Sequence, residues 1–509
     1  MRTISQLFEE AVSRTPSKNW LTYEDETFTF EQAHERILRV AGALAELGVK
    51  RETRILATMR NSPEYLFTWF AAAHLGATLT TVNPRSTAEE LAGLVGQVRP
   101  RIVVTDEDLR TILDTASPPG SDVVMVDALV RSQYDAPPAA ARPDDVAVMI
   151  PTSGTTGRSK LVMQTQRAYV MAGEGFPDWL GLTAADRLMT SLPMFHINAP
   201  SYSIMGSVAV SAGLILLPRF SGSRLIDWAR QYGATEFNAI GAMIEILMRQ
   251  PVRDDDADNP LRLCYTGPSP SKERQLAIEQ RFGFRIVCGY ALSESPYGLI
   301  WKRGTRPFGT LGSPRQHPTM GEINEARVLI NGQAARAGEV GELQLKNPAV
   351  MAGYYDMPEE TAKVMSDGWL RTGDLVEVNG DGTYTFVGRE KEIIRRRGEN
   401  LSPLEVEAAL EAHPAVSEAA VIGVPSELTE EEVKAFVVPL GDASISLGEL
   451  REFVAARVAA FKVPRFLEIV DELPHTPTGR IAKHELQRER TPAEQDFDPQ
   501  PAARDGAAT

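Results

Sequence analysis

A run of small and hydroxylated residues follows an apolar segment in the stretch MIPTSGTTGRSKLVMQT, which extends from Met149 to Thr165. Its hydroxyl and backbone N–H groups can donate to the oxygens of a polyphosphate, because the glycines allow a close approach. The spacing differs from that of the Walker loop, GxxxxGK[ST]. A flexible linker has a similar composition but would not normally follow a buried strand directly. The stretch therefore predicts a phosphate-binding loop with Thr152, Ser153, Gly154, Thr155, Thr156, Gly157 and Lys160.

Four further stretches with charged or aromatic residues follow in order. They are GYALSE (289–294), GWLRTGDL (368–375), GREKEIIRRRGENLSPLEVE (388–407) and PTGRIAKHEL (477–486). Together with the phosphate loop, they make the chain resemble the adenylate-forming superfamily of acyl-CoA synthetases, carrier-protein adenylation domains and luciferases. The resemblance extends to about Leu486, and five motifs in order make a chance match negligible.

The resemblance implies a two-step reaction of a small carboxylic acid. The acid attacks the α-phosphate of ATP in the presence of Mg²⁺, which gives an acyl-adenylate and pyrophosphate. A thiol, such as that of coenzyme A, then attacks the acyl-AMP and releases AMP. In such enzymes a small C-terminal domain rotates on a large N-terminal domain, so that one adenylate pocket serves both steps.

The resemblance also implies roles for individual positions. Glu294 is expected to hold Mg²⁺, because a hard cation prefers a carboxylate, and Ser293 to reach the α-phosphate. His196 matches a residue that lines the acyl pocket in many relatives, although a purely structural histidine remains an alternative. The other implied contacts are Gly267, Pro268, Ser269, Gly289 and Tyr290 around adenine; Asp374 and Arg389 at the ribose; Phe237, Ala291 and Leu292 at the acyl group; Lys391 as hinge; and Gly398, Glu399 and Asn400 at coenzyme A.

Arg480 follows Gly479 in the stretch PTGRIAKHEL. It departs from the family pattern, in which the residue after this glycine is usually lysine. The lysine bridges the substrate carboxylate and the α-phosphate as the adenylate forms. Guanidinium is planar and wider than ammonium, so the exchange is not conservative. We expect a weakened first half-reaction, with preformed acyl-AMP as an alternative substrate supplied by a partner adenylating enzyme. Lys483, three residues on, is a candidate substitute, although relatives often carry a basic residue there.

Strand and helix patterns alternate in the segments that must position these residues. They alternate over 54–128 and again over 213–290, which is typical of doubly wound parallel sheets. Shorter, glycine-rich segments over 309–386 predict a β-rich subdomain. We expect an α/β fold with an N-terminal adenylate-binding domain (1–388), a small, mobile α+β C-terminal domain (389–490) and a disordered tail (491–509).

Composition restricts the classes of protein that the chain can represent. The 509 residues exceed one ordinary core, and the net charge of -15 argues against a nucleic-acid partner. The N-terminus has no apolar leader segment, and no apolar run has the roughly 20 residues that span a bilayer. A cytoplasmic protein without a membrane partner is expected. The sequence leaves open whether it is a monomer or a homodimer.

The acyl-CoA synthetases are the branch of the superfamily that the chain resembles most, because no carrier domain is attached and GEN, SP and EVE follow the hinge. A complete ATP-dependent ligase and an enzyme that loads a separate carrier protein are the alternatives within enzymes. A pseudo-enzyme that binds ATP or acyl-AMP is the alternative outside them, and intact Glu294 and Asp374 argue against it. The arginine at 480 also resembles the diterpenoid-acid ligases of platensimycin-type pathways. The sequence does not identify the acyl substrate.

Overall fold

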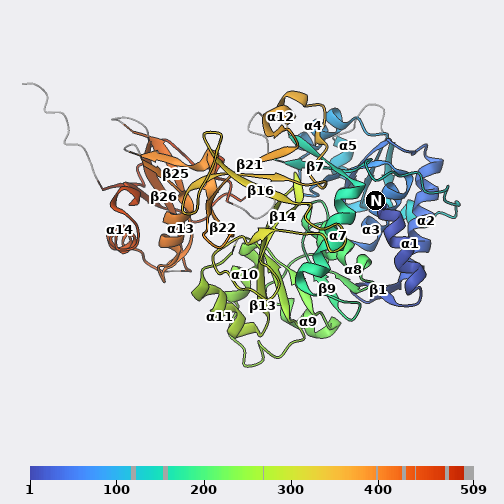
Figure 1. Cartoon of the computed structure of the whole chain (residues 1–509), viewed down its shortest axis with the longest axis horizontal. Helices are drawn as coiled ribbons and strands as arrows, with labels where there is room; N and C mark the ends of the chain where they lie inside the picture. The colour runs from blue at the N-terminus through green and yellow to red at the C-terminus, as the bar shows by residue number, and fades with distance from the viewer. Residues whose placement is uncertain are drawn as a thin grey trace, which may run out of the picture. The chain divides into compact units, whose positions relative to one another are not determined.

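The structure is a computed structural model, and it describes residues 1–115, 122–152, 159–267, 269–396, 399–426, 431–441, 443–475 and 481–497 (Figure 1). By its contacts the chain forms two compact units. The first comprises Met1–Arg327, Gln344–Thr372 and Asn379–Thr385, and the second comprises Val328–Leu343, Gly373–Val378 and the chain from Phe386 onwards.

The segment 54–128 forms the predicted parallel sheet in the first unit. The sheet has the order β19-β8-β7-β4-β3-β5-β6, and Ile55 is in register with both Leu79 and Ile102. Its strands and their helices are β3 (Arg54–Thr58), α3 (Pro63–Leu75), β4 (Thr78–Val82), α4 (Ala88–Val98), β5 (Ile102–Thr105), α5 (Arg110–Thr115), β6 (Asp122–Met125), α6 (Val126–Val130), β7 (Val146–Thr152), β8 (Lys160–Thr165) and β19 (Gly353–Tyr354).

Local sequence signals define where these helices begin and end. The hydroxyl of Ser62 accepts a hydrogen bond from the backbone N–H of Tyr65, and Pro63 takes the first helical position of α3. The helix ends at Gly76, whose φ of 67° lies in the left-handed region that favours glycine. Thr87 and Glu90 form a reciprocal capping box at α4. These signals keep the crossovers short, as a parallel sheet requires.

A second sheet in the same unit contains the segment 213–290. Its order is β15-β14-β13-β12-β11-β9-β10-β1-β2; the strands from β13 to β1 are parallel, whereas β14 and β15 are antiparallel. Its elements are β1 (Asn19–Tyr23), β2 (Glu26–Thr29), β9 (Arg187–Thr190), β10 (Gly213–Leu216), α9 (Leu225–Tyr232), β11 (Glu236–Asn238), α10 (Gly241–Met248), β12 (Leu263–Thr266), α11 (Lys272–Phe282), β13 (Arg285–Leu292), β14 (Ser295–Ile300) and β15 (Ser313–Pro314).

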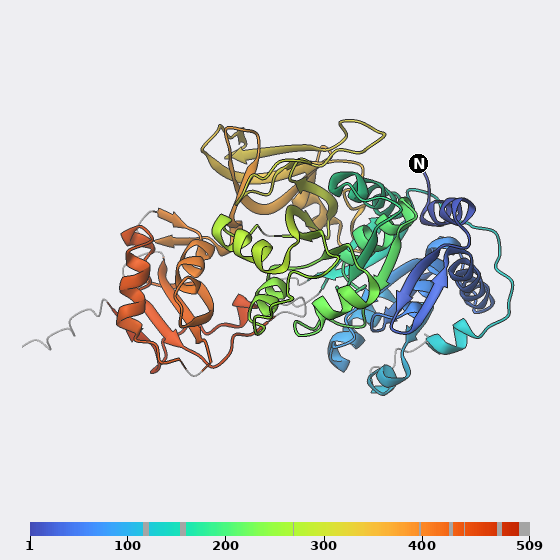
Figure 2. The ribbon, with the colours of Figure 1, turned by 90° about the horizontal axis from the view of Figure 1, so that it is seen from below.

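Five further helical segments pack around these sheets and contribute to the core of the first unit. In Figure 2, α1 and α2 appear in dark blue beside the N-terminus, next to the strand β1. Phe8 of α1 packs on Trp20, Phe30 and Phe70, with ring centroids 4.9 to 5.9 Å apart. The helical segments are α1 (Ile4–Arg14), α2 (Phe30–Glu46), α7 (Gln166–Leu180), η2 (Ala199–Ile204) and α8 (Met205–Ala209).

The segment 309–386 contributes to a smaller sheet, in agreement with the predicted β-rich region. The sheet has the order β17-β16-β18-β21-β20, and β22 pairs with β21. Its strands, with the helix between them, are β16 (Glu325–Ile330), β17 (Gln333–Ala334), β18 (Val340–Lys346), α12 (Pro358–Val364), β20 (Met365–Ser366), β21 (Trp369–Val378) and β22 (Tyr384–Arg389).

The C-terminal part of the second unit is an α+β body with its own core. Its four-stranded sheet has the order β25-β26-β27-β28, and the core includes the fully buried Val406, Val421, Val433 and Leu450. The elements are η3 (Glu390–Glu392), β23 (Ile394–Arg396), β24 (Glu399–Leu401), α13 (Pro403–Glu411), β25 (Val416–Pro425), β26 (Glu431–Pro439), α14 (Leu447–Ala455), β27 (Phe466–Ile469), η5 (Lys483–Glu485) and β28 (Gln495–Asp496).

The first residues of the predicted tail differ from the expectation that the chain lacks structure from Thr491. Gln495 and Asp496 form β28 and pair with Leu467 and Phe466. Arg465 donates to the Asp496 carboxylate at 3.0 Å, which gives this polar strand an anchor that its composition does not reveal. Within the described residues, no helix has both the length and the apolarity needed to cross a bilayer.

Candidate active site

The predicted phosphate loop falls between β7 and β8, two antiparallel strands of the first sheet. Thr152 is paired with Lys160, and the Thr152 hydroxyl donates to the Lys160 carbonyl oxygen at 3.2 Å. The pairing places both residues at the mouth of the hairpin. The loop residues Ser153, Gly154, Thr155, Thr156 and Gly157 lie outside the described residues.

The ammonium group of Lys160 has two partners from one segment. Its nitrogen lies 2.6 Å from a Glu360 carboxylate oxygen and 5.0 Å from the centroid of the Tyr354 ring. Tyr354 is held here because β19 pairs with β8, with Tyr354 opposite Val162. The lysine of the predicted phosphate loop is therefore ion-paired with a carboxylate.

Glu294 lies in the turn between β13 and β14, close to the same tyrosine. The Tyr354 hydroxyl donates to the Glu294 carboxylate at 2.9 Å, and the backbone N–H of Met351 donates to the Glu294 carbonyl oxygen at 2.8 Å. The Gln164 amide donates to the carbonyl oxygen of Ser293 at 2.6 Å. Three segments that are far apart in the sequence, and that contain Lys160, Tyr354 and Glu294, thus converge at one place.

The residues around Glu294 fit Mg²⁺, which binds few protein ligands, better than they fit a metal ion that is held by protein ligands alone. Among the described residues, no group of three or more histidine, cysteine, aspartate or glutamate side chains could hold a metal ion. Magnesium usually takes one or two carboxylates and completes its coordination with water and substrate phosphates. A single carboxylate near the lysine that is predicted to bind phosphate would satisfy that requirement.

The segments predicted to enclose adenine approach each other closely. A Cβ atom on Gly267 would lie 2.5 Å from the Gly289 carbonyl oxygen, so only glycine fits there. Beneath Gly289 lies the fully buried Arg315, which donates to the hydroxyls of Tyr202 and Tyr265 and to the Leu299 carbonyl oxygen. Tyr290 and Ser269 are half-buried beside this backbone, whereas Pro268 lies outside the described residues.

The residues predicted to bind the ribose lie together in the second unit. Asp374 is only 4% exposed, and its carboxylate oxygen lies 3.3 Å from the Arg389 guanidinium. The neighbouring backbone N–H of Gly373 donates to Glu342 at 3.3 Å, which restrains the backbone of β21 just before the aspartate. An oriented carboxylate of this kind can accept two ribose hydroxyls.

The predicted acyl-pocket residues lie in different environments. The His196 ring is half-buried and its centroid is 4.3 Å from that of Phe195. Phe237, by contrast, is 2% exposed and packs on Phe284 inside the core beneath the second sheet. Ala291 and Leu292 are half-buried at the end of β13. The proposed acyl contacts of all four residues remain predictions.

Several residues predicted for the hinge and the thiol step have no described side chain. Lys391 lies in η3, and Glu399 and Asn400 lie in β24, paired with Arg396 and Arg395. The structure describes only the backbone at these positions. Gly398 and Arg480 lie outside the described residues.

Lys483 can be placed, and it is engaged in an ion pair within the second unit. Its nitrogen lies 2.7 Å from a Glu407 carboxylate oxygen and 3.8 Å from Glu392. Burial raises the pKa of Glu407, and the adjacent ammonium offsets part of that shift. The lysine therefore neutralises a buried acid, which weakens its candidacy as a substitute for the usual catalytic lysine.

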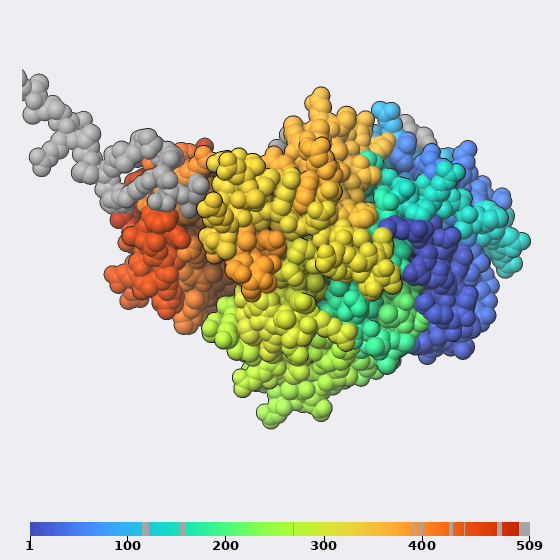
Figure 3. Space-filling model, viewed as in Figure 1, coloured from blue at the N-terminus to red at the C-terminus, as the bar shows by residue number. Residues whose placement is uncertain are grey.

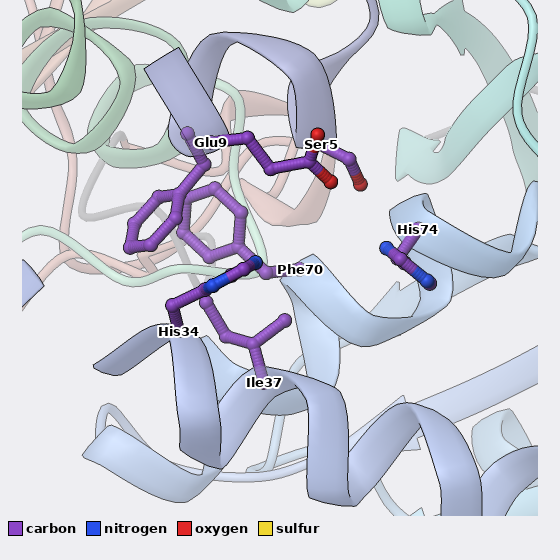
Figure 4. Close-up of a pocket in the computed structure, with 7 residues that line it drawn as sticks. Ser5, Glu9, His34, Ile37, Phe70 and His74 are labelled. Carbon is purple, nitrogen blue, oxygen red and sulfur yellow. The ribbon is translucent and has the colours of Figure 1, made fainter. Parts of the chain in front are cut away.

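A small cavity near the N-terminus is lined by residues that are distant in the sequence from all the predicted site residues. It has a volume of about 10 Å³, enough for a single water molecule, and Figure 4 shows His34 and Phe70 facing it. Its remaining lining residues are Ser5, Phe8, Glu9, Ile37 and His74. Burial lowers the pKa of His34, which favours a neutral, structural histidine. The cavity is too small for a substrate.

Tyr354 and Glu360 contact Lys160, and the sequence analysis did not predict either of them as a site residue. They lie in the stretch GYYDMPEE (353–360), where the glutamates occupy the first turn after a helix-starting proline. Acidic residues are common there because they favour the positive end of the helix dipole. The glycine at the start of this stretch was the one available signal. It does not distinguish an acid that contacts the site from an acid that only caps the helix.

Comparison with known proteins gives a consistent family assignment. A family model described as AMP-binding enzyme matches residues 8–355, and one described as AMP-binding enzyme C-terminal domain matches residues 405–480. The crotonobetaine/carnitine–CoA ligase of Salmonella typhi is 30% identical over 517 residues, which cover 95% of this chain and 99% of the relative.

Solved structures agree with the sequence relatives. The o-succinylbenzoate CoA synthetase of Bacillus subtilis, in complex with its acyl-adenylate intermediate, has a TM-score of 0.86 at 26% identity, covering 95% of this chain and 98% of that one. A benzoate CoA ligase from Burkholderia xenovorans LB400 has a TM-score of 0.87 at 25% identity, covering 96% and 100%. The fold and the family define an adenylate-forming ligase of the acyl-CoA synthetase type. This chain belongs to the AMP-binding enzyme family.

Proposed function

We propose that this enzyme forms an acyl-CoA thioester through an acyl-adenylate, and that Arg480 makes its adenylation step weak relative to its thioester-forming step. The convergence of Lys160, Tyr354 and Glu294 supports the proposal most directly, because Tyr354 links the cation proposed to bind phosphate to the carboxylate proposed to hold Mg²⁺. The named relatives activate different acids as CoA thioesters, which supports the reaction class.

In this scheme the predicted nucleotide contacts divide into groups for the phosphates and groups for the ribose. Lys160 and the loop that precedes it would hold the polyphosphate of ATP, while Glu294 would hold Mg²⁺, which neutralises phosphate charge when bound. Asp374, oriented by Arg389, would accept the ribose hydroxyls. Lys391 would serve as the hinge, and the backbone at Gly398 would admit the pantetheine arm.

The proposed weakness of adenylation depends on two observations. The usual lysine is replaced by Arg480, and the nearby Lys483 already pairs with Glu407 at 2.7 Å. Loss of one preorganised charged donor typically costs about 3–4 kcal/mol, or roughly 10²–10³ in rate. Because arginine retains the charge, the loss here is expected at the lower end of that range.

Two assays on the same preparation separate the half-reactions. Pyrophosphate exchange with ATP and a panel of carboxylic acids measures adenylation, and thioester formation from synthetic acyl-AMP and coenzyme A measures the second step. We expect slow exchange but rapid thioester formation, and Arg480→Lys should accelerate exchange at least tenfold. Robust exchange by the wild type would refute the weak step, and failure of both assays with every acid would refute the ligase function.

The panel should represent the acids named in the relatives as well as the bulkier class suggested by the arginine. Short quaternary ammonium acids, aryl acids and polycyclic diterpenoid acids cover these groups. Replacing coenzyme A with a pantetheine-loaded carrier protein in the second assay tests the carrier-loading alternative. A partner adenylating enzyme is needed only if acyl-AMP, and not the free acid, is consumed.

A further inference from the structure

The segment Gly353–Glu360 contacts both charged residues of the proposed phosphate and magnesium site, Lys160 and Glu294. Tyr354 and Glu360 both contact Lys160, and the Tyr354 hydroxyl also donates to Glu294. The hydrogen bond from the backbone N–H of Tyr354 to the Thr361 hydroxyl, at 2.9 Å, ties β19 to α12 and so fixes the tyrosine relative to the glutamate.

Glu360 is well suited to remain an anion. It also pairs with Lys363, and the hydrogen bonds from Lys160 and Lys363 lower the pKa of Glu360 to about 2. At neutral pH its carboxylate is therefore charged. Its side chain is 30% exposed, and no residue of α12 is buried; the helix lies on the surface in Figure 3, light orange at the top of the view.

We propose that Glu360 is the resting counter-ion of Lys160, and that Lys160 exchanges between this carboxylate and the polyphosphate of ATP or pyrophosphate. The inference rests on the proposed function, in which Lys160 binds phosphate. A partly exposed ion pair is weak, so the more highly charged polyphosphate displaces it at little cost. When pyrophosphate leaves, Glu360 recaptures the ammonium group and shortens the lifetime of the product complex.

Glu360 is thus a positioning residue that opposes phosphate binding and does not take part in the chemistry. Substituting glutamine keeps the shape of the side chain and removes its charge. A ligand that does not reach Lys160 should not respond to the change. AMP has no β- or γ-phosphate, so it provides that reference ligand in the same site.

The test compares the affinities of Glu360→Gln and wild type for Mg²⁺-pyrophosphate, a non-hydrolysable ATP analogue and AMP by calorimetry. We expect the first two to bind about two- to fivefold more tightly in the variant, as loss of a partly exposed ion pair implies, and AMP to bind equally. Glu359→Gln, which removes the same charge from an exposed neighbour, should change none of the three.

Two results would contradict the proposed exchange of Lys160 between Glu360 and polyphosphate. The first is unchanged or weaker pyrophosphate binding in Glu360→Gln. The second is an equal gain in affinity for AMP, which would indicate a general charge effect. In a Lys160→Met background, Glu360→Gln should no longer alter pyrophosphate affinity, and a persistent gain there would also contradict the proposal. Failure of the wild type to bind any nucleotide would instead refute the proposed function itself.

Discussion

The Lys483 ammonium nitrogen lies 2.7 Å from the buried Glu407 carboxylate, and this pair joins η5 to α13. Glu407 is 6% exposed and also accepts a hydrogen bond from the Val421 backbone N–H at 2.7 Å. A buried acid that loses its cation is left uncompensated. The role of Lys483 is therefore structural, and its removal should affect folding.

We expect Lys483→Met to lower the free energy of unfolding by about 3 kcal/mol, as is typical when one partner of a buried pair is removed. Denaturant unfolding followed by fluorescence measures this change. Lys462→Met is the matched control in the same unit, because Lys462 pairs with the exposed Glu405 at 2.6 Å and should cost less than about 1 kcal/mol. Equal losses in the two variants would contradict a structural role specific to Lys483.

Tyr354→Phe should weaken Mg²⁺-dependent nucleotide binding without abolishing it. The substitution keeps the ring beside Lys160 but removes the hydroxyl that orients Glu294, and changes of this kind typically cost roughly 10- to 100-fold. Glu294→Gln should cost more, because it removes the proposed ligand. Titration of Mg²⁺ at fixed ATP measures both effects. Tyr355→Phe, at the next residue, is the control, and a loss there equal to that in Tyr354→Phe would show that the hydroxyl of Tyr354 is not special.

Gly267→Ala should raise the KM for ATP and destabilise the first unit by about 1–3 kcal/mol, the usual cost of overpacking. The added Cβ would lie 2.5 Å from the Gly289 carbonyl oxygen, so β12 and β13 must separate at the predicted adenine position. Steady-state kinetics and thermal unfolding test the two effects. Gly96→Ala in α4, where nothing lies within 4 Å of the new Cβ, should be neutral or slightly stabilising. An unchanged KM for ATP in Gly267→Ala would contradict the prediction that this glycine lies in the nucleotide site.

Glu236→Gln should stabilise the protein more at pH 8 than at pH 5. Glu236 in β11 is fully buried, neither carboxylate oxygen has a hydrogen-bond partner among the described residues, and burial raises its pKa well above the usual value. Asp186 raises the pKa further and Arg262 lowers it, while the adjacent Cys264 thiol is also kept neutral by burial.

The sign of this effect follows from proton linkage. The folded protein retains a proton on Glu236 that the unfolded chain releases above its ordinary pKa, so stability falls as the pH rises toward the folded-state pKa. Glutamine carries no such proton. The Tm of Glu236→Gln should exceed that of the wild type at pH 8 by about 1 °C for each kcal/mol regained, because the unfolding entropy is large for a chain of this size, and the gain should shrink at pH 5. An equal Tm difference at both pH values would contradict the assignment.

Sequence patterns alone determined the sheets and the family. Alternation of strand and helix over 54–128, with a capping serine at 62 and glycine at 76, predicts α3 and its neighbouring strands because those signals are local. The order of the five motifs likewise predicted an adenylate-forming ligase. These conclusions need only residue type and spacing.

Only the tertiary structure decided which charges meet. Lys160 and Glu360 are 200 residues apart, and the pairing of β19 with β8 brings them together. Lys483 reaches Glu407 because η5 packs beside α13, and Phe237 faces the core because of its register in β11. Ion-pair strength depends on distance and burial in three dimensions, and neither quantity follows from positions along the chain.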